Sequence, residues 1–380
     1  MINPSVMTAD TPMKTGTTIY INGRFLTHRL TGVQRFAYEL LSSFKPVAEN
    51  AGYQLIALVP AGATLQMDCP VPVERVGPLD GYAWEQLILP WAARGQFLLN
   101  LANMAPAGKR TQLSLVYDAA VWRVPEAYTW WFRLAYRLLL PRILRRSEVV
   151  ATISGASADD LARYTGTPRS RLTVLRAGGE HIRRTAPDDS VLTRHGLGQR
   201  PFVLAVSSLS PNKNFGAIVR ALALFDSSGF DFVIAGDTNA GVFADQGILI
   251  PDWVKRVGRV SDGQLRTLYE HAALFVFPSF YEGLGLPPLE AMNCGCPVLL
   301  SDIPVFREIY AGAAAFCDPY SDQDIAAKIE QLMAQPQSRE ELTRQGKACA
   351  AFHSWQHGAQ DLLALLQKHV PEQQDREHSN

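Results

Sequence analysis

The sequence lacks any long apolar run, and this absence excludes an integral membrane protein. No stretch reaches the roughly 18 to 20 uncharged apolar residues that a transmembrane helix needs. Residues 1–18 also lack the apolar core of a signal peptide. We therefore expect a protein that stays in the cytoplasm, either free or associated with the inner face of the membrane.

Cysteine is scarce as well. Five cysteines, an odd number, are scattered through 380 residues, which argues against a disulfide scaffold and favours reduced thiols. Cys294 and Cys296 are separated by a single residue and no second pair accompanies them. They therefore do not have the pattern of a zinc site.

The chain has no net charge, since 36 basic residues balance 36 acidic ones. No uniform positive field is available to hold a nucleic acid, so we expect no nucleic-acid partner. The balance hides an asymmetry, because residues 1–180 carry 19 basic and 13 acidic side chains while the remainder carries 17 and 23. The first half is thus positive by 6 and the second half negative by 6.

What the sequence does contain is a recurring alternation of short apolar runs and helical patterns, which predicts an α/β fold with parallel sheets. With 380 residues, of which 47% are hydrophobic, the chain is long enough for two domains with separate cores. A polar segment, residues 177–200, interrupts the alternation and is interpreted as a linker. We predict two doubly wound domains, residues 17–180 and 181–352.

The predicted strands define two sheets. In the first half they are Thr18–Ile21, Leu55–Val59, Phe97–Leu101, Ser114–Tyr117, Glu148–Ile153 and Leu172–Leu175. In the second half they are Phe202–Ser207, Asp231–Ala235, Leu274–Pro278 and Pro297–Leu300. Because such sheets bind ligands at the carboxyl ends of their strands, two facing units would share a ligand cleft.

The most informative segment is residues 275–302, FVFPSFYEGLGLPPLEAMNCGCPVLLSD. A buried strand runs into a loop with Gly283 and Gly285, after which prolines start a helix. Glycines let an anion approach the backbone, and a helix N-terminus carries partial positive charge, so the segment predicts a phosphate site. Glu282 and Glu290 flank the loop and are expected to face one ligand, with Glu290 in the first helical turn. The alternative is that Glu290 complements the helix dipole and Glu282 is solvated.

The run E-G-L-G-L-P-P-L-E, followed by A-M-N-C-G-C-P-V, resembles the E-x7-E donor-binding signature of family 4 retaining glycosyltransferases. The resemblance extends from about Thr18 to Leu366. It implies the two-domain GT-B fold, in which the first domain holds mainly the acceptor and the second domain mainly the nucleotide-sugar donor. A last helix, about residues 353–370, crosses back to the first domain. It also implies transfer of a hexose, with mannose as one candidate, from a nucleotide diphosphate sugar with retention and without a metal. The acceptor would be a saccharide or lipid-linked saccharide in bacterial-type surface polysaccharide or glycoconjugate assembly, and no cofactor is implied.

Site residues follow from the same resemblance, position by position. Lys213 matches the lysine that grips the donor diphosphate, Glu282 the glutamate at the donor-sugar hydroxyls, and Glu290 the one at the ribose. The remaining expected donor contacts are the loop residues Gly283, Leu284, Gly285 and Leu286, the base-binding residues Gly258 and Val260, and Gly32 of the first-domain glycine loop.

Two positions depart from the family pattern. A serine, Ser207 or Ser208, stands where many relatives have a second diphosphate-binding arginine, and Ser208 is retained as a candidate donor contact. Tyr117 stands where relatives have a histidine that faces the sugar, while the following Asp118 is kept as a contact to sugar or acceptor. The alternative for Asp118 is a structural or helix-capping aspartate. The expected catalytic residues are Lys213, Glu282 and Asp118.

The family mechanism needs no carboxylate nucleophile. The acceptor hydroxyl attacks from the face that the nucleotide leaves, and the departing diphosphate helps to remove its proton. Rate enhancement then comes from positioning and from stabilising the leaving group. For this reason the sequence assigns no general base.

Several other patterns have a second interpretation. Asp322 and Asp324 form a D-x-D sequence, which is a metal-binding pattern in other glycosyltransferases, but they open a predicted helix where aspartate is a normal cap. His353 and His357 are four residues apart, without a third ligand to suggest a metal site. Segment 129–146 combines tryptophans, leucines and arginines, as a membrane-surface helix does, although a helix packed on the first sheet has a similar pattern.

Two other classes of protein remain to be separated from a transferase. A nicotinamide-dependent dehydrogenase also pairs α/β domains, but no G-x-G-x-x-G follows the first strand. A nucleotide-sugar-binding protein without turnover is the alternative that the substitutions at Ser208 and Tyr117 leave open.

Overall fold

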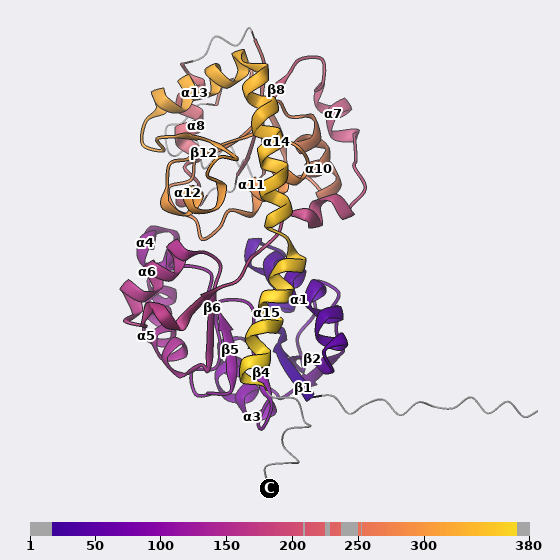
Figure 1. The fold of residues 1–380 in the computed structure, drawn as a ribbon, viewed down its shortest axis with the longest axis vertical. Coiled ribbons are helices and arrows are strands. Elements are labelled where there is room, and N and C mark those ends of the chain that lie inside the picture. Colours follow the sequence, from indigo (N-terminus) through magenta and orange to yellow (C-terminus); the bar gives the residue numbers. More distant parts are fainter. Residues whose placement is uncertain (1–16, 208–209, 225–228, 237–249, 252, 371–380) are drawn as a thin grey trace, which may run out of the picture.

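The computed structural model describes residues 17–207, 210–224, 229–236, 250–251 and 253–370. They form two α/β domains stacked one above the other, with the first domain below and the second above in Figure 1. Each domain has a parallel β-sheet flanked by helices. In the described part of the chain, no helix is both long enough and apolar enough to cross a membrane.

The first sheet has seven strands in the order β3-β2-β1-β4-β5-β6-β7, and all neighbouring pairs are parallel. The strands are β1 (Thr17–Asn22), β2 (Tyr53–Pro60), β3 (Val73–Val76), β4 (Phe97–Asn100), β5 (Gln112–Leu115), β6 (Val149–Thr152) and β7 (Leu172–Val174).

The second sheet has six parallel strands in the order β10-β9-β8-β11-β12-β13. The strands are β8 (Phe202–Ser207), β9 (Asp231–Gly236), β10 (Lys255–Gly258), β11 (Leu274–Phe277), β12 (Val298–Ser301) and β13 (Ala315–Cys317).

The two sheets share one topology. In each, the first strand lies between the second and the fourth, so that the chain reverses its direction of growth beside β1 and beside β8. These points, between β1 and β4 and between β8 and β11, are the topological switch points where doubly wound folds bind ligands. The fold therefore provides one candidate crevice in each domain.

The helices follow the alternation that the sequence predicts. The first domain contains η1 (Gly23–Thr27), α1 (Gly32–Asn50), α2 (Gly81–Ala83), η2 (Trp84–Ile88), α3 (Leu89–Ala92), α4 (Ala120–Arg123), η3 (Pro125–Ala127), α5 (Trp130–Arg146), α6 (Gly155–Thr165) and η4 (Arg169–Arg171). After η5 (Glu180–Arg184) come α7 (Ser190–His195), η6 (Pro211–Lys213), α8 (Phe215–Leu222), α10 (Asp262–His271), α11 (Leu286–Asn293), α12 (Pro304–Tyr310), α13 (Asp322–Ala334), α14 (Pro336–Phe352) and α15 (Trp355–His369).

The central strands are apolar because helices cover both faces of each sheet. Strands β4, β6, β11 and β12 are buried at every position, as expected for parallel strands inside an α/β layer structure. The strands that the sequence did not predict, β3, β10 and β13, lie at sheet edges. The first two carry charged residues, VERV and KRVG, which hide the apolar pattern of a strand.

Helix α15 returns from the second domain to the first. In Figure 1 it continues downward from α14 along the front of the molecule and lies against α1. Trp355, at its start, packs edge-on against Phe36 of α1 with ring centroids 5.0 Å apart. Gly358 lets the helix approach closely, because a Cβ at this position would lie 2.3 Å from the carbonyl oxygen of Arg176. Arg176 also pairs with Asp361 at 2.6 Å.

The linker prediction for residues 177–200 was wrong in part, because this segment contains η5 and α7 and packs against both domains. This segment can pack closely against both domains because Gly178 and Gly179 have no side chains. A Cβ on Gly179 would lie 2.5 Å from the backbone of Leu289 in α11, and one on Gly178 would lie 2.5 Å from the backbone nitrogen of Trp355. The segment is therefore held between the second domain and the start of α15.

Candidate active site

The switch point of the second sheet brings the two main predicted catalytic side chains together. Lys213 ends the turn that follows β8, and Glu282 lies in the loop that follows β11. The Nζ of Lys213 donates to the Oε1 of Glu282 at 2.7 Å, and it also lies 5.1 Å from the centre of the Phe277 ring. Both side chains are largely buried, with exposed fractions of 23% and 9%. The charge of Lys213 is thus balanced by Glu282, in the loops that follow β8 and β11.

Two asparagines fix the turn that carries Lys213. Asn214 adopts a left-handed conformation (φ 53°), which asparagine tolerates better than most residues. Its side-chain amide donates to the carbonyls of Pro278 and Pro319 at 3.0 and 2.7 Å. The amide of Asn212 donates to the carbonyl of Tyr281 at 3.1 Å. The lysine turn is thereby tied directly to the glutamate loop.

The glycine loop is tightly packed at Gly285, and the approach of an anion to it stays a prediction. Gly285 has φ +84°, and a Cβ there would lie 2.8 Å from the Phe306 ring. The hydroxyl of Tyr310 donates to its carbonyl at 2.7 Å. The helix that follows, α11, begins at Leu286 with prolines at its second and third positions, and proline has no N–H. Backbone donors for an anion therefore come mostly from the loop, residues 283–286, rather than from the first helical turn.

Asp118, a residue of the first domain, lies beside the glycine loop of the second domain. A Cβ on Gly283 would lie 3.0 Å from the Oδ2 of Asp118, so the two residues are in contact across the domain junction. Burial raises the pKa of Asp118 to about 6, and the nearby carboxylate of Glu282 adds to the rise, while Lys213 and a hydrogen bond from the backbone N–H of Ala120 oppose it. The structure thus joins Lys213, Glu282 and Asp118 in one site.

Hydrogen bonds close the domain junction around this site. Ser154 and Ser157 donate their hydroxyls to the carbonyl of Gly283 at 2.7 and 3.2 Å. The backbone N–H of Ala119 donates to the hydroxyl oxygen of Tyr281 at 3.1 Å. Glu308 accepts from the backbone N–H groups that begin α6 at 2.6 and 2.8 Å, where a carboxylate also complements the helix dipole.

The loops at Gly32 and at Gly258 and Val260, predicted to bind the donor phosphates and base, come from the two domains and are linked by an ion pair. Gly32 begins α1, and nothing lies within 4 Å of a Cβ built on it. Gly258 ends β10 with φ +70°, and Val260 follows it. Arg35 of α1 pairs at 2.8 Å with Asp262, two residues after Val260. Since Arg35 lies one turn after Gly32, this ion pair places the two loops on facing domains.

Glu290 does not lie where the sequence predicts. Because α11 begins at Leu286, Glu290 is in its second turn, and both of its carboxylate oxygens have protein partners. The ring nitrogen Nε2 of His181 lies 3.0 Å from one, and the hydroxyl of Tyr269 donates to the other at 3.2 Å. Trp355 in turn donates its indole N–H to the Nδ1 of His181 at 3.2 Å. The side chain of Glu290 is therefore held by His181 of η5 and Tyr269 of α10. A contact between Glu290 and the ribose of a donor stays a prediction.

Tyr117 is a core residue in this chain. It is only 5% exposed, its hydroxyl donates to the carbonyls of Val33 and Leu101, and its ring packs 4.8 Å from that of Phe36. Tyr117, which lies two residues after β5, thus ties the end of this strand to α1 and to Leu101. Ser208 lies outside the described residues.

The side chains of the D-x-D sequence and of the histidine pair, which were considered as metal ligands, have protein partners. Asp322 pairs with Arg220 at 2.7 Å, and Asp324 accepts from the backbone N–H of Asp318 at 2.7 Å. His357 lies 2.9 Å from the carbonyl of Phe352 through its Nδ1. Among the residues that the structure describes, no group of three or more His, Cys, Asp or Glu side chains is arranged to hold a metal ion.

Several residues of the site were missed from the sequence. Asn212 and Asn214 flank the lysine, and their side chains hold it through residues more than 60 positions away. Ser154, which caps α6, and Tyr281, beside Glu282, form the junction. The only available signal was that polar residues follow the ends of strands, where ligands bind in this type of sheet.

Comparison with known proteins identifies the second domain. Residues 193–348 match the family described as glycosyl transferases group 1. The O-antigen chain mannosyltransferase B of Escherichia coli is 30% identical over 225 residues, which are 56% of this chain and 59% of that protein. The O-antigen chain mannosyltransferase RfbU of Salmonella typhimurium is 27% identical over 229 residues, 59% of this chain and 62% of that protein. The matches thus span about three fifths of these curated relatives.

Solved structures match the whole fold. HepE from Anabaena, in complex with UDP-glucose, superposes with a TM-score of 0.71 at 16% identity, covering 93% of this chain and 99% of that one. WaaG, a glycosyltransferase involved in lipopolysaccharide biosynthesis, gives 0.69 at 16% identity, covering 92% and 99%. The predicted GT-B architecture with two doubly wound domains is confirmed, and residues 193–348 of the second domain match the family of group 1 glycosyl transferases.

Proposed function

We propose that this protein transfers a hexose, with mannose as the first candidate, from a nucleotide diphosphate sugar to a saccharide or lipid-linked saccharide acceptor. The proposal includes retention of configuration and a role in the assembly of a bacterial-type surface polysaccharide or glycoconjugate. The observation that carries it is the meeting of Lys213, Glu282 and Asp118 beside the glycine loop. The O-antigen mannosyltransferases among the relatives support the choice of mannose, and the UDP-glucose complex of HepE supports a nucleotide-sugar donor.

The chemistry needs only groups that the site contains. The bond between C1 of the sugar and the diphosphate oxygen breaks, and a bond from C1 to the acceptor oxygen forms on the same face. The proton of the acceptor hydroxyl passes to the departing diphosphate. Lys213 leaves Glu282 and neutralises the charge that grows on the diphosphate, a contribution that often exceeds any other single one in such reactions. Glu282, once released, accepts hydrogen bonds from sugar hydroxyls.

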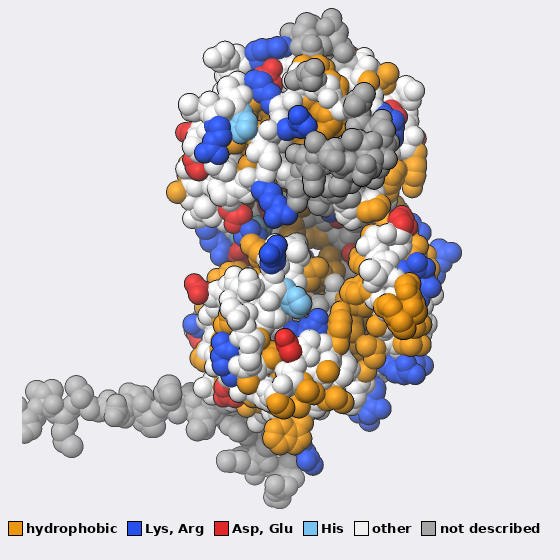
Figure 2. All heavy atoms as spheres, turned by 180° about the vertical axis from the view of Figure 1, so that it is seen from behind, with side chains coloured by type: hydrophobic (Ala, Val, Ile, Leu, Met, Phe, Trp, Pro, Cys, Tyr) orange, Lys and Arg blue, Asp and Glu red, His pale blue; other side chains and the backbone are white. Residues whose placement is uncertain are grey.

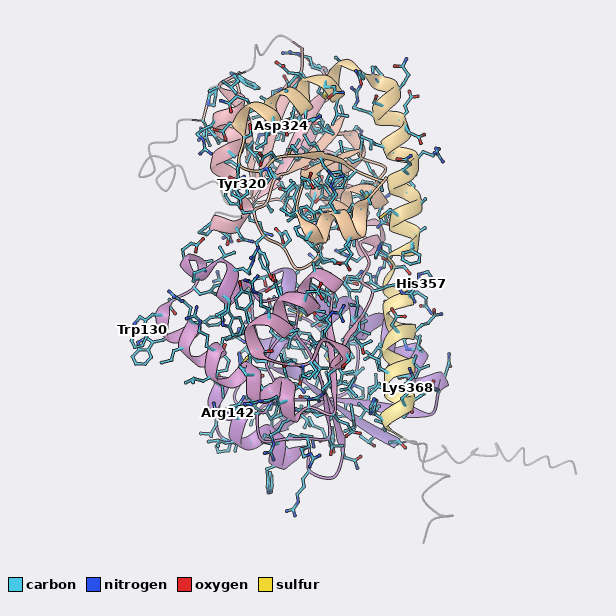
Figure 3. All side chains as sticks on the ribbon, turned by 60° about the vertical axis from the view of Figure 1, so that its left-hand side comes forward. Trp130, Arg142, Tyr320, Asp324, His357 and Lys368 are labelled. Atoms are coloured by element: carbon cyan, nitrogen blue, oxygen red, sulfur yellow. The ribbon has the colours of Figure 1, made fainter. Side chains whose placement is uncertain are left out.

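We further propose that α5 holds the protein at an anionic membrane surface, where a lipid-linked acceptor would lie. Trp130 and Trp131 are 58% and 66% exposed, and Leu134 and Leu138 share their face of the helix. Trp130 projects away from the first domain in Figure 3, and Figure 2 shows hydrophobic side chains gathered on that domain beside Lys and Arg side chains. Exposed rings with neighbouring arginines fit the interface of anionic lipids.

The test of the transferase is a donor screen with product analysis. The protein is incubated with mannose and glucose donors carrying GDP, UDP or dTDP, together with hexose disaccharides as acceptors. We expect nucleotide release that depends on the acceptor, and an NMR anomeric signal that shows the same configuration as the donor. An inverted product would contradict retention. Donor binding without transfer or hydrolysis would instead favour the non-catalytic sugar-nucleotide-binding protein.

The membrane contact is tested separately by sedimentation with phosphatidylglycerol or phosphatidylcholine vesicles. We expect binding to the anionic vesicles only, and loss of binding when Trp130 and Trp131 are both replaced by serine. The matched control replaces exposed Trp91 by serine. Equal sedimentation of both variants with phosphatidylglycerol would contradict a role for α5.

A further inference from the structure

A buried chain of hydrogen bonds links the second domain to the start of α15. The hydroxyl of Tyr269 donates to one carboxylate oxygen of Glu290 at 3.2 Å, and the Nε2 of His181 lies 3.0 Å from the other. The indole N–H of Trp355 donates to the Nδ1 of His181 at 3.2 Å. All four residues are buried, so water competes little for these hydrogen bonds.

The partners of His181 determine where its ring carries a proton. The indole nitrogen of Trp355 can only donate, so the Nδ1 of His181 must accept. A neutral imidazole that accepts at Nδ1 carries its proton on Nε2. The Nε2–H group therefore donates to the Oε1 of Glu290. A doubly protonated ring would place an N–H group against the indole N–H, so this arrangement requires the neutral ring.

Backbone packing fixes the position of His181 beside α11. A Cβ on Gly179 would lie 2.5 Å from the carbonyl carbon of Leu289 and 2.6 Å from the backbone nitrogen of Glu290. The main chain two residues before His181 therefore touches the helix at Glu290 itself. The separation of the imidazole and the carboxylate is thus set by contact between two main-chain segments.

Trp355 connects this group to the first domain. Its backbone N–H donates to the Oε1 of Glu180 at 2.6 Å, its ring packs edge-on against Phe36 of α1, and it is fully buried. Trp355 begins α15, where the last two helices pass from the second domain to the first in Figure 1. His357, two residues further on, lies at this junction in Figure 3. The packing of α15 on the first domain therefore reaches the ring of His181.

The carboxylate of Glu290 keeps acceptor capacity for a ligand. An ionised carboxylate has about four lone-pair positions, of which His181 and Tyr269 use two. The side chain of Glu290 remains 11% exposed, whereas that of His181 is 3% exposed. Both ring nitrogens of His181 already have protein partners, so His181 acts on a ligand only through Glu290.

We propose that His181 is a positioning residue for donor binding, an inference that rests on the proposed function. It holds the carboxylate of Glu290 in one orientation, so that the free lone pairs are ready for the ribose hydroxyls of the nucleotide. A carboxylate that turned freely would have to be ordered each time a nucleotide binds, which weakens binding. Because Trp355 sets the tautomer of His181, the first residue of α15 contributes to donor affinity in the second domain.

The test compares nucleotides with and without ribose hydroxyls. UDP, GDP and their 2′,3′-dideoxy analogues are titrated into the full-length protein by isothermal titration calorimetry. We expect the wild type to bind UDP or GDP about tenfold more tightly than the matching dideoxy analogue, as hydrogen bonds to a fixed carboxylate allow. His181→Leu should reduce this preference to below about threefold and leave dideoxy binding unchanged. His181→Gln retains an N–H donor and should keep most of the preference.

A second variant tests the role of the tryptophan. Trp355→Phe keeps a ring against Phe36 but removes the indole N–H, so the ring of His181 should populate both tautomers and the ribose preference should fall. Nitrogen NMR of histidine-labelled protein measures the tautomer, and the wild type should carry its proton on Nε2 alone. The matched control is Tyr53→Phe, which removes the buried hydrogen bond from Tyr53 to the carbonyl of Val370 at the other end of α15. It should lower the melting temperature and leave the ribose preference unchanged.

The outcomes separate the positioning role from the proposed function. An unchanged ribose preference in His181→Leu, in a protein that still binds UDP or GDP, would overturn the role of His181 and leave the proposed function standing. A wild-type ring protonated at Nδ1 would overturn it as well, and this measurement does not depend on the folding of any variant. An equal loss of preference in Tyr53→Phe would show that helix packing alone is responsible. A wild type that binds no nucleoside diphosphate would contradict the proposed donor site and the role of His181 together.

Discussion

The two switch points of this molecule use the same topology for different chemistry. In the second domain, loops after β8 and β11 carry Lys213 and Glu282, a charged pair beside a glycine-rich turn. In the first domain, the segments after β1 and β4 line a cavity with an aromatic wall that includes Phe132, and with the ion pair of Arg24 and Glu85. Both crevices therefore hold a cation paired with a carboxylate, and they differ in the glycine-rich turn of the second and the aromatic rings of the first.

The two crevices share one architecture and differ in their side chains. The backbone places both crevices at the carboxyl ends of parallel strands, and the side chains alone decide what each one binds. Asp118 is shared, because it lines the cavity and contacts Gly283. Asp118 therefore lies where the two crevices meet.

The largest effect should come from removing the cation of the second crevice. Lys213→Ala should reduce turnover about 100- to 1,000-fold, since a preorganised charge on the leaving group is worth that much in comparable sites. Acceptor-dependent nucleotide release provides the measurement. Lys368→Ala, an exposed lysine on α15, is the control and should keep full activity. Turnover by Lys213→Ala within threefold of wild type would contradict the role of this residue.

A smaller effect, on stability, distinguishes the two glycine loops. Gly285→Ala should destabilise the protein by about 1–3 kcal/mol, because φ +84° is strained for alanine and its Cβ would lie 2.8 Å from Phe306. Gly32→Ala should change stability by less than about 0.5 kcal/mol, since its Cβ meets open space. Chemical denaturation measures both. Equal losses would show that the second-domain loop is not the more tightly constrained one.

The residue that belongs to both crevices should give a pH-dependent effect. The pKa of Asp118 rises from 3.8 to about 6 on folding, so between these values the folded protein binds a proton that the unfolded chain does not. The resulting stabilisation is present at low pH and is lost as the pH rises through 6. Asp118→Asn removes it, so the wild type should lose a few degrees more in melting temperature between pH 5 and 7 than this variant. Parallel pH profiles would contradict the raised pKa.

The smallest effect is expected from the ion pair that joins the domains beside Gly32. Arg35 and Asp262 are partly exposed, so Arg35→Ala should cost less than about 1 kcal/mol and should matter less in high salt. Arg344, which pairs with Glu341 within one helix, provides a control of the same kind. A loss well above that of Arg344→Ala in thermal denaturation would show that this pair clamps the crevices together.

The glycine loop of the second crevice could be predicted from the sequence because its parts lie close together along the chain, although Lys213 is 69 residues from Glu282. Residues 275–290 contain the strand, the glycines and both glutamates, and the lysine follows a strand in an equally local pattern. Glu290 was expected in the first turn of α11 and lies in the second, because the helix begins at Leu286 and not at the prolines. Its partner His181 is 109 residues away in the chain, so no local pattern connects the two.

The first crevice could not be predicted, because its wall is assembled from distant segments. Asn22, Glu85 and Phe132 meet only when parallel strands bring their loops to one end of the sheet. The helix at 129–146 was recognised, but its inward rings were hidden among outward tryptophans and arginines. Which face turns inward depends on tertiary packing that periodicity alone does not show.

The central claim is that a diphosphate replaces Glu282 as the partner of Lys213. A crystal structure with a bound sugar nucleotide tests it most directly. We predict a phosphate oxygen at about 2.8 Å from the Nζ of Lys213, within reach of the loop amides of residues 283–286, and with Glu282 turned to the sugar. A nucleotide bound elsewhere, with the Lys213–Glu282 pair intact, would contradict the account.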